Sequence, residues 1–468
     1  MTAGQKNAAV LDLTHGGIII AQKMAQLGYN VSAIDVYNTV DPATLADLQN
    51  NFDIKTSKSP IPVDEFDIIV APVHLDPNYE MLQQARDMGK EIVTHHKIVG
   101  EILSHDKTIV STGAKIIEIT GTKAKTSTAS ILADMLSRKM NVVLHTTRGL
   151  EYWENGTPSL IYQGLSIAPG SILHAVDKTA SYISSNSKSK PNIVPDVYIF
   201  EVSIGGTGYA DIGILTTLTQ DYRIANNTAW ASDTKMQMLD NAKPGSTVVI
   251  NCTDDAATGR TLDDSVKKVT FSDSNDCNAD VNLALDEYAI IINSGNWMSV
   301  INAQHGYDIG SYTTAMVAAA TAALEMGIEL DIIRDTLAHF GGLSGRMREQ
   351  VFEGKTLIDN SNSGMNIISV EKSLVYASTL QIKKKGRIIM VLGEEAAQVC
   401  EGLPPEDVSG FLLQQGKNID ELVLVGERMH AVKYENAHYA DSLTQGLTVA
   451  SGIAGANDLI LSCVKCFR

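Results

Sequence analysis

The most constraining feature of this sequence is a steady alternation between short apolar runs and segments with a helical pattern. Ala8–Asp12 and Val31–Asp35 are typical of buried strands, and the helix expected between them ends near Leu27, where Gly28 supplies a helix-terminating residue. The alternation continues to the last expected strand, Asp458–Cys463. Strands that alternate with helices form parallel sheets covered by helices, so the sequence predicts an α/β fold.

The length indicates several units of this kind. At about 150 residues per domain, the 468 residues suggest about three domains. The first group of strand-like runs closes near residue 113, and the expected helices Ser311–Met326 and Glu329–Phe340 end at Gly341-Gly342. We therefore expect a Rossmann-like N-terminal domain over 1–113, a P-loop-type central domain over 114–340 and a Rossmann-like C-terminal domain over 341–468. Ser184–Pro195 is expected to be an exposed loop, and Gln350–Asp359 a strand or a hairpin.

A candidate phosphate-binding loop lies between the expected strand Lys115–Thr120 and the expected helix Lys125–Arg138. In such a connection, free backbone N–H groups and the helix dipole face an anion. Lys125 would neutralise phosphate oxygens, and Thr126 would place a hydroxyl on Mg²⁺. The candidate nucleotide contacts are Gly121, Thr122, Lys123, Ala124, Lys125, Thr126 and Ser127.

This loop departs from a full Walker A motif. Ala124 stands where the motif has glycine, so its backbone φ must be negative or tolerably strained. The alternative interpretation is an ordinary helix N-terminus that carries Thr and Lys.

Polar side chains at later strand ends favour the nucleotide-binding interpretation. Glu201 ends one buried strand, Asp221-Tyr222 follows the next, and Lys235 comes 13 residues after Tyr222 on an expected helix. Asn251 ends a further strand. Open α/β sheets bind ligands at the carboxyl ends of their strands, where these residues lie.

In this order, the motifs resemble those of the Mur ligases, a family of three-domain, ATP-dependent, amide-forming enzymes. Gly121–Thr126 resembles the family's GTxGKT loop, and Glu201 with Ser203 resembles its E-x-S strand end. Tyr222 replaces a metal-ligating histidine, and Lys235 falls at a lysine that the family carbamylates. The resemblance implies ATP and Mg²⁺, with Lys125 and Lys235 as catalytic residues and Thr126, Glu201 and Lys235 around the metal.

The resemblance continues into the C-terminal third. Gly345-Arg346-Met347 resembles the family's entry motif, and Asp359 begins a segment like its nucleotide-contacting D-x-x-x-H/N stretch. The resemblance therefore implies that Asn251, Arg346 and Asp359 contact the nucleotide. Gly306–Ala315 departs from the family, because the expected G-x-H-N-x-x-N pattern is absent.

The N-terminal quarter, where members of the family differ in substrate, resembles one branch in methanogenic archaea. Leu11–Gly17 and Gly164–His174 carry this likeness. It implies that ATP activates a propionate of a nickel seco-tetrapyrrole acid and that a carbocyclic ring then closes, with nickel arriving only in the substrate. The candidate substrate contacts are Thr14, His15, Arg148 and His174. The alternatives are an amide ligase that adds an amino acid to a peptide or nucleotide-linked precursor, and a non-catalytic protein that binds tetrapyrrole or nucleotide.

Charge and composition restrict the partners. The 37 Lys and Arg residues against 54 Asp and Glu residues give a net charge of −17, which repels nucleic acids. A substrate with several carboxylates then needs a local basic patch, for which Arg148 and Lys178 are candidates. No apolar run approaches the roughly 18 residues of a membrane span, no signal peptide is recognised, and five scattered cysteines do not indicate a disulfide framework. We expect a cytoplasmic protein with no membrane partner; the sequence carries no indication of oligomeric state.

Overall fold

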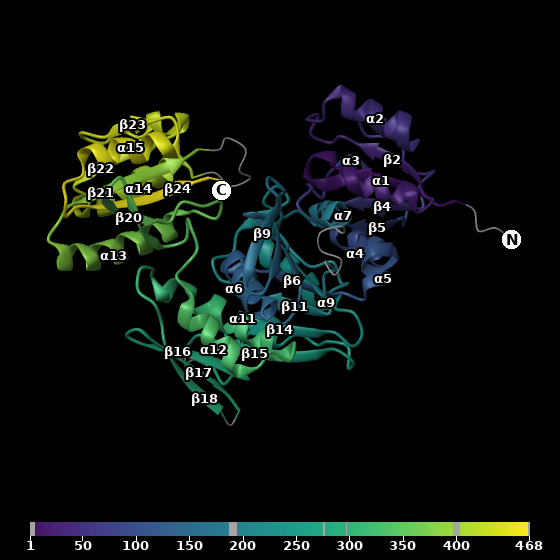
Figure 1. Cartoon of the computed structure of the whole chain (residues 1–468). Coiled ribbons are helices and arrows are strands. Elements are labelled where there is room, and N and C mark those ends of the chain that lie inside the picture. The colour runs from purple at the N-terminus through teal and green to yellow at the C-terminus, as the bar shows by residue number, and fades with distance from the viewer. Residues whose placement is uncertain (1–4, 187–193, 275–276, 296, 396–402, 467–468) are drawn as a thin grey trace. The chain divides into compact units, whose positions relative to one another are not determined.

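The computed structural model describes residues 5–186, 194–274, 277–295, 297–395 and 403–466 (Figure 1). The chain divides into two compact units. The first holds residues 1–284, 291–299 and 314–336, and the second holds residues 285–290, 300–313 and 337–468. The structure is of the mixed α/β class that the sequence predicts, and the residue boundaries expected at 113/114 and 340/341 stay a prediction.

The first sheet is parallel throughout and has the order β3-β2-β1-β4-β5. Its strands are β1 (Asn7–Leu11), β2 (Asn30–Ile34), β3 (Lys55–Ser57), β4 (Ile68–Ala71) and β5 (Glu91–Thr94). Its helices are α1 (Ile18–Gln26), α2 (Pro42–Phe52), α3 (Glu80–Asp87), α4 (His95–His105) and α5 (Lys107–Thr112), and a π-helical turn, η1 (Leu13–Gly17), follows β1. Because the order reverses at β1, the loops after β1 and β4 flank a topological switch point.

The second sheet has eleven strands in the order β18-β17-β16-β15-β14-β11-β6-β10-β7-β8-β9. Its strands are β6 (Lys115–Thr120), β7 (Val142–Thr146), β8 (Gly149–Glu154), β9 (Thr157–Tyr162), β10 (Val197–Glu201), β11 (Ile212–Leu215), β14 (Thr247–Asn251), β15 (Lys267–Ser272), β16 (Val281–Asp286), β17 (Ala289–Ser294) and β18 (Trp297–Asn302). The strands from β15 to β7 are parallel, whereas β7, β8 and β9 form an antiparallel meander that the sequence analysis missed.

Helices and a small ribbon accompany this sheet: α6 (Lys125–Ser137), α7 (Pro169–Asn186), α8 (Ala231–Lys235), α9 (Gln237–Asp240), α10 (Asp255–Thr258), α11 (Thr313–Glu325), α12 (Leu330–His339), and the pair β12 (Arg223–Ile224) and β13 (Ala229–Trp230). Residues 315–323 of α11 are buried without interruption, and six of these nine residues are alanines, whose small side chains allow close packing on every side. Helix α7 extends to Asn186, so the loop expected from Ser184 begins later than predicted, and its residues 187–193 lie outside the described part.

The third sheet has the order β19-β20-β24-β21-β22-β23. Its strands are β19 (Arg348–Phe352), β20 (Lys355–Asp359), β21 (Ile388–Glu394), β22 (Glu421–Val425), β23 (His438–Ala440) and β24 (Leu459–Lys465), with helices α13 (Ile367–Lys384), α14 (Pro405–Gln415) and α15 (Leu443–Ile453). Only the β19–β20 pair is antiparallel within this sheet, which confirms the hairpin interpretation of residues 350–359.

Two cysteines are paired, although a single bridge does not make a disulfide framework. Cys252 and Cys277 form a disulfide with a Cα–Cα distance of 6.2 Å. They follow the neighbouring parallel strands β14 and β15, whose pairing brings together residues 25 positions apart. Cys463 and Cys466 are buried thiols, and burial raises the pKa of Cys463 to about 12.

Candidate functional site

The loop between β6 and α6 is held against the end of β11. Gly121 has φ +143°, and a Cβ built there would lie 2.0 Å from Thr216 Oγ1, so only glycine fits. The backbone N–H of Thr122 donates to the carbonyl of Thr217 at 2.8 Å, and Thr216 Oγ1 donates to the carbonyl of Lys123 at 2.6 Å. These bonds fix the path of the loop before the helix begins.

Ala124 adopts the strained of the two conformations that the sequence allowed. It precedes the first residue of α6 with φ 66° and ψ −8°, in the left-handed region that favours glycine. The Lys125 side chain folds back over the loop, where its Nζ donates to the Gly121 carbonyl at 3.0 Å. Ala124 therefore takes the left-handed backbone at the position where the motif has its second glycine.

Glu201 lies at the start of this helix, although 75 residues separate it from Thr126. Its strand β10 pairs with β6, which brings the two strand ends to one edge of the sheet. Thr126 Oγ1 donates to Glu201 Oε2 at 2.8 Å, and the Thr147 N–H donates to the same oxygen at 3.3 Å. The Glu201 carboxylate is buried, and a carboxylate beside a hydroxyl supplies the oxygen ligands that Mg²⁺ prefers. These residues fit a magnesium ion.

Lys235 is buried at the end of the short helix α8, with an exposed fraction of 1%. Asp221 fixes the start of that helix, because it accepts hydrogen bonds from the Ser232 N–H at 2.9 Å and from the Ser232 hydroxyl. The Lys235 Nζ lies 4.5 Å from the centroid of the Tyr222 ring. A buried ammonium is costly, and the face of the Tyr222 ring offsets part of that cost. Conversion of Lys235 to a carbamate stays a prediction.

Asn251 ends β14, two strands from the loop, and is buried. Its Nδ2 donates to the Thr216 carbonyl at 3.4 Å, which ties it to the end of β11, against which the loop is held. Asp254 follows it and accepts a hydrogen bond from the Leu218 N–H at 3.0 Å. Burial raises the pKa of the Asp254 carboxyl to about 6, and the neighbouring charge of Asp255 adds to the shift.

Three of the four candidate substrate contacts lie on two elements that touch. Thr14 and His15 belong to η1, and His174 lies on α7. The two elements pack closely, since a Cβ on Gly170 of α7 would lie 2.5 Å from the Gly16 carbonyl oxygen of η1. Desolvation lowers the pKa of the half-buried His174. Arg148 lies elsewhere, in the turn between β7 and β8. Their contact with substrate stays a prediction.

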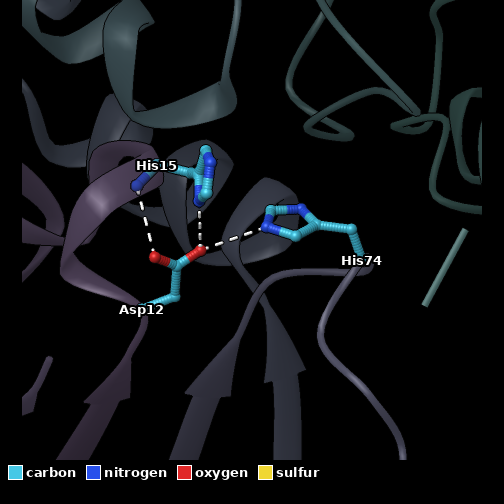
Figure 2. A group of neighbouring side chains, drawn as sticks. All are labelled: Asp12, His15 and His74. Carbon is cyan, nitrogen blue, oxygen red and sulfur yellow. Dashed lines mark hydrogen bonds and ion pairs between the residues drawn. The ribbon is translucent and has the colours of Figure 1, made fainter. Parts of the chain in front are cut away.

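Sequence reasoning did not select Asp12 or His74, which surround His15. His15 Nδ1 and His74 Nε2 lie 2.7 Å and 3.1 Å from Asp12 Oδ2 (Figure 2). His74 directly follows the apolar run Phe66–Val73, which is typical of a strand, and this position was an available signal because Glu201 and Asn251 were selected at strand ends.

Arg346 and Asp359 belong to the second compact unit. Asp359 ends β20 and is buried, and its carboxylate accepts hydrogen bonds from the Gly345 N–H at 3.0 Å and the Ser361 N–H at 3.2 Å. The Arg346 carbonyl accepts a hydrogen bond from the Tyr312 hydroxyl. Asp359 therefore holds the turn that carries Arg346, and the nucleotide contacts of both residues stay a prediction.

Comparison with known proteins identifies the family of the chain. Residues 119–304 match the Mur ligase middle domain, and residues 349–466 match the C-terminal domain of coenzyme F430 synthetase CfbE. The chain is 50% identical over 99% of its length to coenzyme F(430) synthetase of Methanosarcina acetivorans, of which it covers 99%. It is 22% identical to UDP-N-acetylmuramoylalanine–D-glutamate ligase of Caldanaerobacter subterraneus, with 100% of this chain and 94% of that protein covered.

The fold has solved counterparts. MurF ligase from Thermotoga maritima, determined in complex with ADP, superposes with a TM-score of 0.53 at 13% identity and covers 99% of this chain and 92% of its own. None of the helices within the described residues is long and apolar enough to cross a membrane. Because a relative with 50% identity spans almost the whole length, this chain belongs to the coenzyme F(430) synthetase family of Mur-type ligases.

Proposed function

We propose that this ATP-dependent ligase activates a propionate carboxylate of a nickel seco-tetrapyrrole acid as an acyl phosphate and then closes a carbocyclic ring. The observation that carries the proposal is the contact of Thr126 with Glu201 at the start of α6, beside a loop of phosphate-binding shape. The likeness to a coenzyme F(430) synthetase over the whole chain supports the choice of substrate.

The carboxylate must be activated because its negative charge resists attack. Transfer of the γ-phosphoryl group to the carboxylate needs charge neutralisation and alignment. Lys125 supplies a positive charge at the loop, and the N–H groups at the start of α6 face the phosphates. Thr126, Glu201 and a carbamate on Lys235 would hold Mg²⁺, which neutralises phosphate charge when bound.

In the second step, a carbon of the same macrocycle gives up its proton and attacks the acyl carbon, and the acyl C–O bond breaks to release phosphate. The substrate therefore loses one water overall. Because nucleophile and electrophile belong to one molecule, a correctly held conformation supplies roughly 7–11 kcal/mol through effective molarity. A substrate surface formed by η1 and α7 would hold the rigid macrocycle in that conformation. Exclusion of water there protects the acyl phosphate from hydrolysis.

Mass spectrometry of a reaction with the nickel seco acid, ATP and Mg²⁺ tests the proposal. We expect a product lighter by one water, formed with ADP and phosphate and without any added amino acid. A product that contains an amino acid would favour amide ligation, and absence of nucleotide turnover would favour a binding protein.

The same assay tests the loop. Lys125→Ala should abolish product while the folded content is unchanged, because the ammonium that folds back over the loop would no longer neutralise phosphate charge. Lys139→Ala is the matched control, since that lysine lies just beyond the other end of α6, is half exposed and pairs with Glu329 at 3.1 Å. Turnover retained in Lys125→Ala would contradict the loop assignment.

A further inference from the structure

A second cluster, of one carboxylate and two imidazole side chains, lies outside the nucleotide loop, at the carboxyl edge of the first sheet (Figure 2). Asp12 directly follows β1, His15 lies in η1, and His74 lies in the loop after β4. Strands β1 and β4 are parallel neighbours on either side of the point where the strand order reverses. Ligands of open α/β sheets bind in the crevice at this point.

The Asp12 carboxylate is held in one orientation by backbone N–H groups of the turn that follows it. Its Oδ1 accepts hydrogen bonds from the N–H groups of Thr14 at 3.0 Å and His15 at 3.3 Å, which leaves Oδ2 directed at the two imidazoles. The residue is fully buried and has φ 67° and ψ 89°, a conformation rarely adopted outside glycine. Strained backbone of this kind is concentrated at functional sites.

The second carboxylate oxygen has two imidazoles as neighbours. Oδ2 lies 2.7 Å from His15 Nδ1 and 3.1 Å from His74 Nε2. The three side chains therefore present one carboxylate oxygen and two ring nitrogens to the same point.

The geometry points to a metal centre: we propose that Asp12 Oδ2, His15 Nδ1 and His74 Nε2 bind one divalent transition-metal ion. Imidazole and carboxylate ligands lie about 2.0–2.2 Å from Zn²⁺, so adjacent ligand atoms stand roughly 3.3–3.6 Å apart around a tetrahedral ion. The two distances to Oδ2 are 2.7 Å and 3.1 Å, and the ligand atoms of all three residues lie within 4.8 Å of one another. Small side-chain movements would therefore complete the site.

The ligand set selects the class of ion. Two imidazoles and one carboxylate suit Zn²⁺, Co²⁺, Ni²⁺ or Fe²⁺, whereas Mg²⁺ prefers oxygen ligands. Structural zinc sites have four protein ligands, and three ligands leave a position open for a further molecule. This site is thus separate from the magnesium ligands at Thr126 and Glu201.

The open position would take a carboxylate, and this part of the inference rests on the proposed function. The chain carries a net charge of −17, which opposes binding of a substrate with several acid arms. One dication with the single Asp12 charge gives the crevice a net charge of +1, next to the candidate substrate residues Thr14 and His15. An acid arm can then bind the ion directly.

Metal titration of the full-length chain tests the site without ATP or tetrapyrrole, so its outcome is independent of the proposed reaction. Untagged protein, stripped with a chelator and kept in excess Mg²⁺, is titrated with Zn²⁺ by calorimetry and with Co²⁺ by absorption spectroscopy. We expect one ion per chain with a micromolar or lower Kd, and a Co²⁺ spectrum that changes when acetate is added.

Variants locate the bound ion. His74→Gln should weaken binding at least about 10-fold, while His105→Gln, at the exposed end of α4, should bind as the unaltered chain does. His74 lies on a loop and is partly exposed, so His74→Gln should fold, and circular dichroism checks this; Asp12→Asn is the second variant. Absence of stoichiometric binding, or equal binding by His74→Gln, would overturn the site, and a Co²⁺ spectrum unchanged by acetate would overturn the open position.

Discussion

Replacement of Ala124 by glycine should make the protein more stable. Ala124 has φ 66° in the loop before α6, and a left-handed conformation costs an L-residue roughly 1–2 kcal/mol. Glycine removes this cost but loses more conformational entropy on folding, about 0.4–1 kcal/mol. The difference predicts a net gain of about 0.5–1 kcal/mol for Ala124→Gly, or a rise of about 1–4 °C in the unfolding temperature of this part of the chain.

Thermal unfolding at fixed scan rate and protein concentration measures the change, with and without ADP. Ala43→Gly is the matched control, because Ala43 is exposed in the first turn of α2, where the same substitution should cost about 0.5–1 kcal/mol. The two substitutions are thus expected to change the unfolding temperature in opposite directions. An unchanged or lowered unfolding temperature in Ala124→Gly would refute the inference that the loop is strained at this residue.

Three further predictions concern the buried groups and the packing around them. Lys235→Ala should be inactive and partly rescued by short-chain carboxylic acids that replace a carbamate, as measured by product formation; wild-type activity without rescue would remove its metal role. Gly170→Ala should lower the free energy of unfolding, measured in urea, by about 1–3 kcal/mol, because the new Cβ would lie 2.5 Å from the Gly16 carbonyl oxygen. Gly452→Ala is the control and should not lower it, because open space surrounds Gly452. Burial lowers the pKa of His145 to about 4, so between pH 6.5 and 4 the unfolded chain binds a proton that the folded chain does not. The free energy of unfolding therefore falls as the pH falls, and His145→Phe should reduce its decrease between pH 7 and 5 by about 2 kcal/mol. An equal decrease in the variant and the unaltered chain would contradict this account.

The parallel strands were predictable because their apolar runs are continuous. Lys115–Thr120 matches β6 in both bounds, and the expected helix from Lys125 differs from α6 by one residue at its end. The strand expected to end near Glu201 has an apolar pattern over Val194–Ser203, which extends beyond β10 at both ends, because such a pattern can continue past the hydrogen-bonded part of a strand. The pattern of apolar residues indicates which residues are buried, whereas the bounds of a strand depend on which neighbouring strand forms hydrogen bonds with it.

The antiparallel meander β7–β9 was missed although one signal was present. Asn155-Gly156 connects β8 to β9, and both residues have positive φ, 51° and 74°. Asn-Gly between two strands is a strong indicator of a tight hairpin. The pattern of β9 was less informative, because five of its six residues are exposed and no buried face marks it as a strand.

The candidate site was predictable to the extent that strand ends could be read. Glu201 and Asn251 follow from the strand pattern, and Lys125 follows from the loop motif. The distances that make Thr126 and Glu201 partners depend on the order of strands in the sheet, in which β10 lies beside β6. The cluster of Asp12, His15 and His74 depends in the same way on β1 pairing with β4, which spacing along the chain does not reveal.

A continuous series of backbone contacts links the two candidate sites inside the first compact unit. Gly16, next to His15, packs on Gly170 at the start of α7. Ile167, just before that helix, accepts a hydrogen bond at 2.9 Å from the N–H of Ser203, two residues beyond Glu201. Backbone segments in direct contact change their separation far less readily than side chains do, because packed interiors have little free volume. The distance between the candidate substrate residues on η1 and the phosphate loop is therefore set by main-chain packing. Substitutions that alter this packing should affect the alignment of the acid arm and the nucleotide, although the substituted residues touch neither one.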